Sequence, residues 1–241
     1  MCNLKLSLKL ILISALAILS GCASTQQVDG VNDPYENYNR TMYSFNKTLD
    51  KTIVKPAAQV YDTVLPDPII WAISNFFSNL REVRVVINDL LQFKFEQAVN
   101  DFGRLALNTT VGFGGIFDVA GHAGHTANNE DFGQTLGVWG LEPGPYLVLP
   151  FLGPRNVRDT VGLVGDTYTH PKSYTKDEGA RNALLIAGLL DTRAALLGIN
   201  NVLNEAATDE YNYVRDAYTQ QRLNLVYDGN PPEEDFDVFS D

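Results

Sequence analysis

Apolar side chains return at helical spacing along most of this chain, and segment 67–94 shows it best. Its Ile, Phe and Leu residues recur every three or four positions, while polar residues such as Arg81 and Asp89 fill the opposite side. Asp67 is suited to cap the amino end, and Pro68 fits the first helical turn. The pattern predicts a long amphipathic helix.

Four more segments show a similar helical pattern. We expect helices over 96–110, 180–206 and 209–227, and one or two shorter helices within 35–65. No segment shows sustained alternation of apolar and polar residues, which is the pattern of a half-buried strand. The predicted fold is therefore mostly α, a single helical domain without a large sheet.

Two connections between these helices are unusually apolar and rich in glycine and proline, at 110–124 and 131–166. Connections between helices in compact domains are normally short and polar. A bilayer also rejects irregular backbone that faces lipid tails. Two locations remain open: burial in the protein core, or a position at a membrane interface. Trp139 and Tyr146 are candidate membrane-interface residues, because amphipathic rings gather there.

The amino terminus has the features of a bacterial lipoprotein signal. Lys5 and Lys9 precede the short apolar run 10–19, and Leu-Ser-Gly-Cys follows, ending at Cys22. This tetrapeptide resembles the lipobox, in which the cysteine is acylated and becomes the new amino terminus. We predict a signal peptide over 1–21, lipid attachment at Cys22 and a lipidated tether over 22–32. Ala23 favours the outer membrane over retention in the inner membrane.

Length and charge limit the remaining possibilities. The chain has 241 residues, 45% of them hydrophobic, which suffices for one domain or at most two small ones. A net charge of −11 disfavours nucleic acid, and it disfavours recruitment to an anionic membrane by charge alone. The acidic segment 228–241, which contains Pro231 and Pro232, is predicted to be a disordered tail, although a binding role stays open.

The chain offers no convincing catalytic constellation. It lacks a G-x-S-x-G nucleophile elbow, and its single mature cysteine is the predicted acylation site. Gly112, Gly114 and Gly115 lack the lysine of a phosphate-binding loop. His122 and His125 lie three residues apart in a glycine-rich stretch, which does not match a zincin pair. We therefore expect no enzyme, no metal and no cofactor.

Several blocks of the sequence resemble the VacJ/MlaA family of outer-membrane lipoproteins. The resemblance spans most of 33–227, and the predicted lipobox agrees with it. The blocks follow the family order and are NDPYENYNRTMYSFN (32–46), NFFSNL (75–80), RLALNTTVGFGGIFDVA (104–120), DFGQTLGVWGLEPGPYLVLPFLGPRNVRD (131–159) and VRDAYTQQR (214–222).

This resemblance implies a ring-like helical domain with in-plane membrane helices and an amphipathic channel. It implies a protein anchored in the inner leaflet of the outer membrane and facing the periplasm. Such a protein removes mislocalised phospholipids from the outer leaflet and maintains lipid asymmetry. The implied partners are phospholipids, a trimeric outer-membrane porin, and a soluble periplasmic carrier that feeds an inner-membrane ABC transporter.

The resemblance also suggests candidate channel or gate residues, although core packing stays open for each of them. Two other functions also remain: a structural porin-associated lipoprotein without lipid passage, and a lipid hydrolase. The candidates are Met42, Tyr43, Phe45, Gly112, Phe113, Gly114 and Gly115.

Overall fold

The computed structural model describes residues 31–199 and 209–232. The predicted signal peptide, the lipid attachment site at Cys22, nearly all of the tether and most of the acidic tail lie outside these residues.

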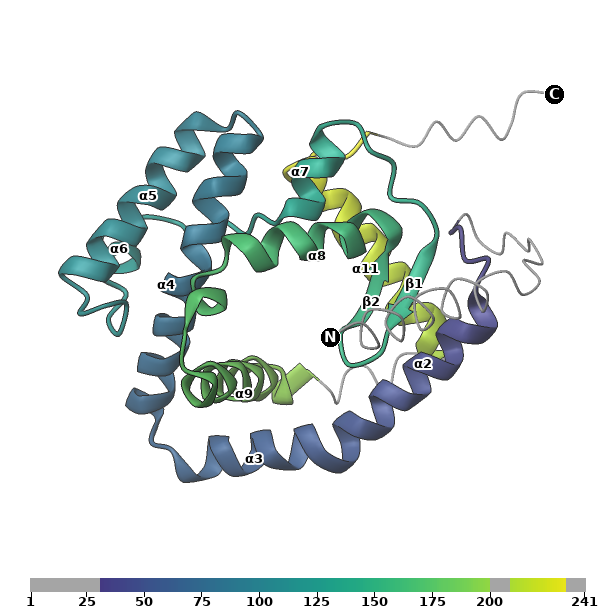
Figure 1. The fold of residues 1–241 in the computed structure, drawn as a ribbon, viewed down its shortest axis with the longest axis horizontal. Helices are drawn as coiled ribbons and strands as arrows, with labels where there is room; N and C mark the ends of the chain where they lie inside the picture. The colour runs from purple at the N-terminus through teal and green to yellow at the C-terminus, as the bar shows by residue number, and fades with distance from the viewer. Residues whose placement is uncertain (1–30, 200–208, 233–241) are drawn as a thin grey trace, which may run out of the picture.

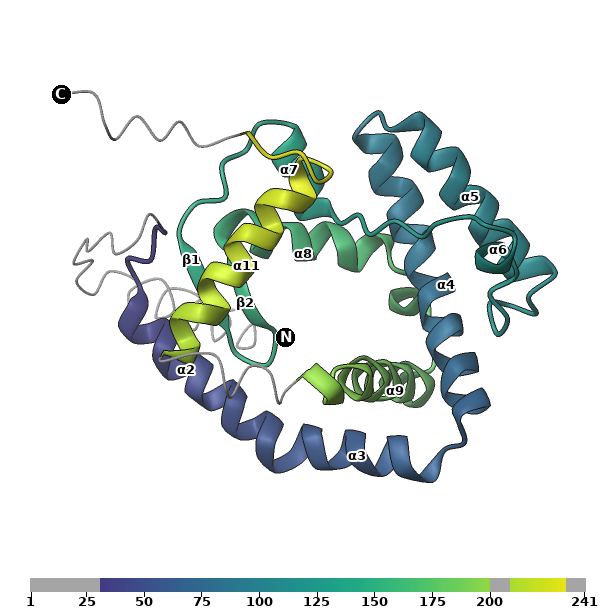
Figure 2. The same cartoon turned by 180° about the vertical axis from the view of Figure 1, so that it is seen from behind.

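The described helices form a ring (Figure 1). One side is a continuous helical rod made of α2 (Glu36–Leu49), the π-helical turn η1 (Asp50–Val54) and α3 (Lys55–Val64). The long helix α4 (Asp67–Leu91) forms the next side. Helix α8 (Val157–Thr169), a β-hairpin and helix α11 (Glu210–Val226) close the ring, and Figure 2 shows α11 crossing beside the hairpin.

The remaining helices lie outside or within this ring. Helices α5 (Phe95–Thr110) and α6 (Val119–His122) lie on the outer side of α4, and α7 (Phe132–Val138) lies on the outer side of α8. Helix α9 (Glu178–Ala195) lies within the ring against α3 and α4. Two 3-10 turns flank α9, η2 (Pro171–Tyr174) before it and η3 (Leu197–Ile199) after it.

The structure confirms the mostly α fold and the ring-like arrangement, with small adjustments at helix ends. Asp67 is the first helical residue rather than the cap, because the turn begins at Pro66. Helix α9 ends at Ala195, earlier than expected, and part of the predicted extension lies outside the described residues.

The apolar connection 131–166 is more regular than the sequence indicates. It contains α7, the antiparallel strands β1 (Tyr146–Leu149) and β2 (Gly153–Asn156), and most of α8. Tyr146 pairs with Asn156 and Leu149 pairs with Gly153. Strands of four residues bounded by prolines are too short to show a clear alternation.

The interior of the ring wall is largely polar. Among the described residues, buried polar side chains outnumber buried apolar ones. Fully buried Asn39 links α2 to the hairpin, because its amide donates to the Tyr146 carbonyl and its oxygen accepts from the Val148 amide. Buried polar groups are costly unless they are paired, so these networks fix the register of neighbouring elements.

Large apolar side chains are exposed instead, including Trp71 at 63% and Phe102 at 61%. In the described part of the chain, none of the helices combines the length and apolar character needed to cross a bilayer. The described part of the molecule therefore exposes a surface suited to apolar surroundings.

Candidate functional site

Helix α8 presents an apolar stripe to the centre of the ring. Its buried face packs on α7, where Gly162 lies so close to the Gly133 backbone that an added Cβ would be 2.5 Å from the Gly133 nitrogen. Helix α8 lies between α7 and the ring centre (Figure 1). The opposite face therefore points inward, and its exposed residues recur at helical spacing: Val157, Val161, Val164 and Tyr168.

Helix α9 presents a second stripe to the same centre. Its outward face contacts α4, because Asp191 accepts a hydrogen bond from the Ser74 hydroxyl and Gly188 lies against the Phe77 ring. Its other face carries three exposed apolar residues, Leu185, Ile186 and Leu189. The inner surface of the ring thus has two apolar stripes contributed by different helices.

The predicted channel residues of α2 divide into two groups. Met42 and Tyr43 pack against the buried cluster of Tyr146, Val148, Tyr211 and Tyr218. The Tyr43 hydroxyl donates to Glu210 over 2.6 Å. Burial is the main cause that raises the pKa of the Tyr43 hydroxyl well above its usual range, and the hydrogen bond to the Glu210 carboxylate raises it further. The structure therefore shows Met42 and Tyr43 packed against the protein core.

Phe45 differs from Met42 and Tyr43, because its side chain is 43% exposed. Its ring meets the Phe151 ring edge-on with centroids 5.4 Å apart. Phe151 belongs to the turn of the hairpin, so this aromatic pair joins α2 to the hairpin tip.

The glycine-rich candidates lie at the end of α5, against α4 and on the outer side of the ring. Gly112 allows a close approach, since an added Cβ would lie 2.3 Å from the Phe117 carbonyl oxygen. Gly115 has φ +91° and approaches Asn79 of α4. Phe113, next to Gly114, is 74% exposed. The structure brings none of these four residues to the inward stripes.

Trp139 and Tyr146 have different surroundings. Trp139 is 53% exposed, and its indole nitrogen donates to the Leu91 carbonyl over 3.0 Å. Tyr146 is only 3% exposed and lies among Tyr211 and Tyr218. The expectation that Tyr146 faces a membrane interface is therefore wrong, because its ring completes the core beneath α11.

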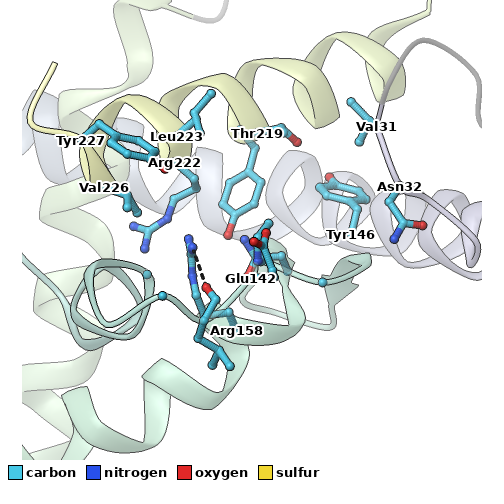
Figure 3. Close-up of a pocket in the computed structure, with 17 residues that line it drawn as sticks. Val31, Asn32, Glu142, Tyr146, Arg158, Thr219, Arg222, Leu223, Val226 and Tyr227 are labelled. Carbon is cyan, nitrogen blue, oxygen red and sulfur yellow. Dashed lines mark hydrogen bonds between the residues drawn. The ribbon is translucent and has the colours of Figure 1, made fainter. Parts of the chain in front are cut away.

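A pocket of about 350 Å³ lies between α11 and the connection from α7 to β1 (Figure 3). Its polar lining includes Arg158, Arg222, Tyr218 and the carboxylate of Glu142. Arg222 forms two hydrogen bonds to Asp131, of 2.6 and 2.9 Å, and its Nε lies 2.7 Å from Asp159.

The carboxylates of Asp131 and Asp159 balance the positive charges of Arg222 and Arg158 beside this pocket. Arg158 contacts Asp159 over 3.1 Å, and the Tyr218 hydroxyl donates to Asp159 over 2.6 Å. Burial alone would raise the pKa of Asp131, but the hydrogen bonds and charge of Arg222 outweigh it and hold that pKa well below its usual range. This network clamps α7, α8 and α11 together.

The two histidines noted in the sequence make local contacts. His125 Nδ1 lies 2.9 Å from the Asn100 side-chain oxygen, and His122 Nδ1 lies 2.7 Å from the Asp118 carbonyl oxygen. Within residues 31–199 and 209–232, no three His, Cys, Asp or Glu side chains gather in a way that could hold a metal ion.

Sequence reasoning missed both inward stripes. Val157, Val161, Val164 and Tyr168 follow i, i+4, i+7, i+11 spacing, which predicts a helix face. The glycines and prolines of 131–166 obscure this periodicity, because they indicate a broken connection rather than a helix.

Comparison with known proteins agrees with the ring. The family model described as MlaA lipoprotein matches residues 31–225. The chain is 38% identical to the intermembrane phospholipid transport system lipoprotein MlaA of Escherichia coli K12, covering 87% of this chain and 86% of that protein. The Haemophilus influenzae protein of the same name is 35% identical, covering 90% and 89%.

A solved structure also matches, and it is described as "Structural basis for maintenance of bacterial outer membrane lipid asymmetry". It has a TM-score of 0.72 and 35% identity, covering 80% of this chain and 98% of that one. The family match, the identity over most of the length and the shared ring together establish that this chain belongs to the MlaA lipoprotein family.

Proposed function

We propose that this protein is the outer-membrane lipoprotein of an intermembrane phospholipid transport system. It removes mislocalised phospholipids from the outer leaflet through the ring and so maintains lipid asymmetry. The names of the relatives support this proposal, and so does the solved structure concerned with outer-membrane lipid asymmetry.

The observation that carries the proposal is the pair of apolar stripes on α8 and α9. Acyl chains need apolar contact along their path, and the stripes lie on the inward faces of these two helices. The protein places polar residues inside its wall and apolar residues on its exposed faces, which suits a wall with lipid on both sides. Transport of this kind requires no bond to be made or broken.

The same proposal includes location and partners. Acylation at Cys22 anchors the domain in the inner leaflet of the outer membrane, facing the periplasm, since two or more acyl chains hold a protein stably. The exposed aromatic residues of α4 and α5 seat these helices in the plane of the leaflet. A trimeric porin holds the ring in place. A soluble periplasmic carrier receives the lipid and delivers it to an inner-membrane ABC transporter.

The decisive experiment uses cells that lack the gene. We expect outer-leaflet phospholipid to rise while bulk lipid synthesis continues, and the unaltered protein to reverse this. Val164→Asp places a charge on the α8 stripe, so we expect it to fail to restore asymmetry although the protein is present at normal levels. Gln59→Asp adds the same charge on an exposed position of α3 and should restore it.

A photo-crosslinking residue at Leu189 of the α9 stripe separates transport from scaffolding. A lipid path should give phospholipid adducts at this position, whereas a structural porin-associated lipoprotein should give none. Unchanged outer-leaflet phospholipid in the deletion strain, or full complementation by Val164→Asp, would contradict the transport proposal.

A further inference from the structure

A group of basic side chains lies at the junction of α4, α8 and η2. Arg81 and Arg84 belong to α4, His170 follows α8, and Lys172 lies in η2. This concentration of positive charge stands out in a chain whose net charge is −11. We refer to Arg81, Arg84 and Lys172 as the basic cluster.

One face of α4 positions the two arginines. Ser74 and Phe77 on this face contact α9 through Asp191 and Gly188. Arg81 and Arg84 continue the same face at helical spacing, so they lie toward the interior of the ring. The turn η2 contacts α4 and lies on its inner side in Figures 1 and 2. The charges of Arg84 and Arg81 act on Lys172, so the three groups are neighbours.

The acids around the basic cluster leave much of its charge uncompensated. Asp166 of α8 approaches Arg84 only to 3.9 Å. Asp191 of α9 accepts from Ser74, and Glu82 of α4 pairs with Arg104 over 2.8 Å. The charges of Asp191 and Glu82 offset part of the positive charge at Arg81, but burial and Arg84 outweigh them. Among the described residues, neither Arg81 nor Lys172 has a carboxylate within 4.0 Å, and the buried Nε of Arg84 has no acceptor.

The cations of this region repel one another. Burial and the charge of Arg84 lower the pKa of Arg81, and burial with the charges of Arg84 and Arg81 lowers the pKa of Lys172. Burial, followed by the positive charges of Lys172, Arg84 and Arg81, lowers the pKa of His170 to about 4. His170 is therefore neutral near pH 7, and a bound anion would relieve the repulsion between the other three groups.

An apolar cavity lies at the same end of α8 as His170 and η2. It has a volume of about 460 Å³ and lies between the end of α8 and η2. Tyr168 lines it two residues before His170, and Ser173 follows Lys172 directly. Val164 belongs both to this cavity and to the inward stripe of α8, so the cavity is continuous with that stripe.

We propose that the basic cluster binds the phosphodiester of a phospholipid headgroup, with the glycerol and the upper acyl chains extending toward the cavity between α8 and η2. Arginine and lysine together match a phosphodiester, which stays anionic at physiological pH and offers several acceptor oxygens. The proposal rests on the proposed lipid transport and adds a headgroup contact to it. The phosphate is common to zwitterionic and anionic lipids, so this contact suits phospholipids as a class.

Direct titration tests this site. The full lipidated protein in a phosphate-free detergent is titrated with short-chain phosphatidylglycerol and phosphatidylcholine below their micelle concentrations, and with inorganic phosphate. We expect Arg81→Gln/Lys172→Gln to weaken binding of both lipids by about tenfold or more, as for lost charge-assisted hydrogen bonds. Arg81→Lys/Lys172→Arg keeps the charges and should retain most of the affinity.

The matched control is Lys51→Gln/Lys55→Gln, which removes the same charge from the opposite side of the ring. Circular dichroism verifies the fold of each variant. Equal affinities in the cluster variant and the control would overturn the proposed site while leaving lipid transport intact. Inorganic phosphate binding as tightly as lipid would indicate a free-anion site instead. Failure of the unaltered protein to bind either lipid would count against the proposed function itself.

Discussion

Burial of charged side chains determines which of them form ion pairs and which keep a proton in this protein. Glu82 and Arg104 form a buried ion pair between α4 and α5. Asp89 and Asp101 are fully buried nearby, and neither carboxyl oxygen of Asp89 has a hydrogen-bond donor. Burial, and then the neighbouring Asp101 carboxylate, raises the pKa of Asp89 to about 8. Two neighbouring buried carboxyl groups retain one proton between them.

This proton makes stability depend on pH. Unfolded aspartate ionises near pH 3.9, so between about pH 4 and pH 8 Asp89 stays protonated in the folded protein but is ionised in the unfolded chain. The contribution of Asp89 to the free energy of unfolding therefore falls as pH rises through this window and levels off above about pH 8, with a slope of at most about 1.4 kcal/mol per pH unit. His170 is neutral in the folded protein, so it contributes with the opposite sign between about pH 4 and pH 6.5. Asp89→Asn should remove the Asp89 contribution, so its free energy of unfolding should fall less between pH 7 and pH 9 than that of the unaltered protein, and the variant should be the more stable at pH 9.

Denaturant unfolding at pH 5, 7 and 9 measures the effect, with Asp62→Asn on the exposed side of α3 as the control. The same slope in Asp89→Asn and in the unaltered protein would show that Asp89 does not hold the proton.

Glycine determines how closely elements approach one another. Gly162 of α8 meets the Gly133 backbone, and Gly165 meets the Phe132 ring, so α7 and α8 pack with little space between them. This contact turns the apolar stripe of α8 toward the centre. Asp159, near Gly162, ties the same helix to Arg222 and Tyr218 of α11. Close packing and buried ion pairs therefore set the orientation of α8 together.

Gly162→Ala should destabilise the protein by about 1–3 kcal/mol, because the added methyl group would overlap the Gly133 backbone, which can only shift as a unit. Gly103→Ala in α5 is the matched control. An added Cβ there meets no atom within 4 Å, and alanine favours a helix over glycine by up to about 1 kcal/mol. Thermal unfolding of both variants should give shifts of opposite sign. A Gly162→Ala protein as stable as the parent would show that α7 and α8 can separate freely.

The whole molecule is a ring whose wall is polar within and apolar on its faces. Figure 1 shows α9 inside the ring, so helices distant in sequence bring their apolar stripes to one centre. The exposed aromatic residues of the outer helices need apolar surroundings. The proposed lipid anchor places the ring where such surroundings exist.

Cys22→Ser tests the anchor at this scale. Without acylation we expect the protein to be lost from the outer-membrane fraction, and outer-leaflet phospholipid to rise toward the level of the deletion strain. Membrane fractionation and outer-leaflet labelling measure these two outcomes. Cys2→Ser lies within the predicted signal peptide and should have neither effect. A correctly sorted and fully active Cys22→Ser protein would make the anchor dispensable.

The sequence by itself determined the mostly α class, the long helices and the family. Periodicity predicted α4, α5 and α11 because each is long enough to repeat its apolar positions several times. The ordered blocks of residues were sufficient to indicate the family. Periodicity alone could not show which apolar stripes face the ring centre, because a stripe has the same spacing whether it meets a core, a lipid or a channel.

Only the tertiary structure decided those orientations. It moved Tyr146 into the core, placed Gly112 and Gly115 outside the ring, and resolved the apolar connection into α7, a hairpin and α8. It also brought Arg81 and Lys172 together from positions about ninety residues apart in the sequence. Local spacing determines which residues share a helix face, whereas contacts between distant elements determine what that face meets.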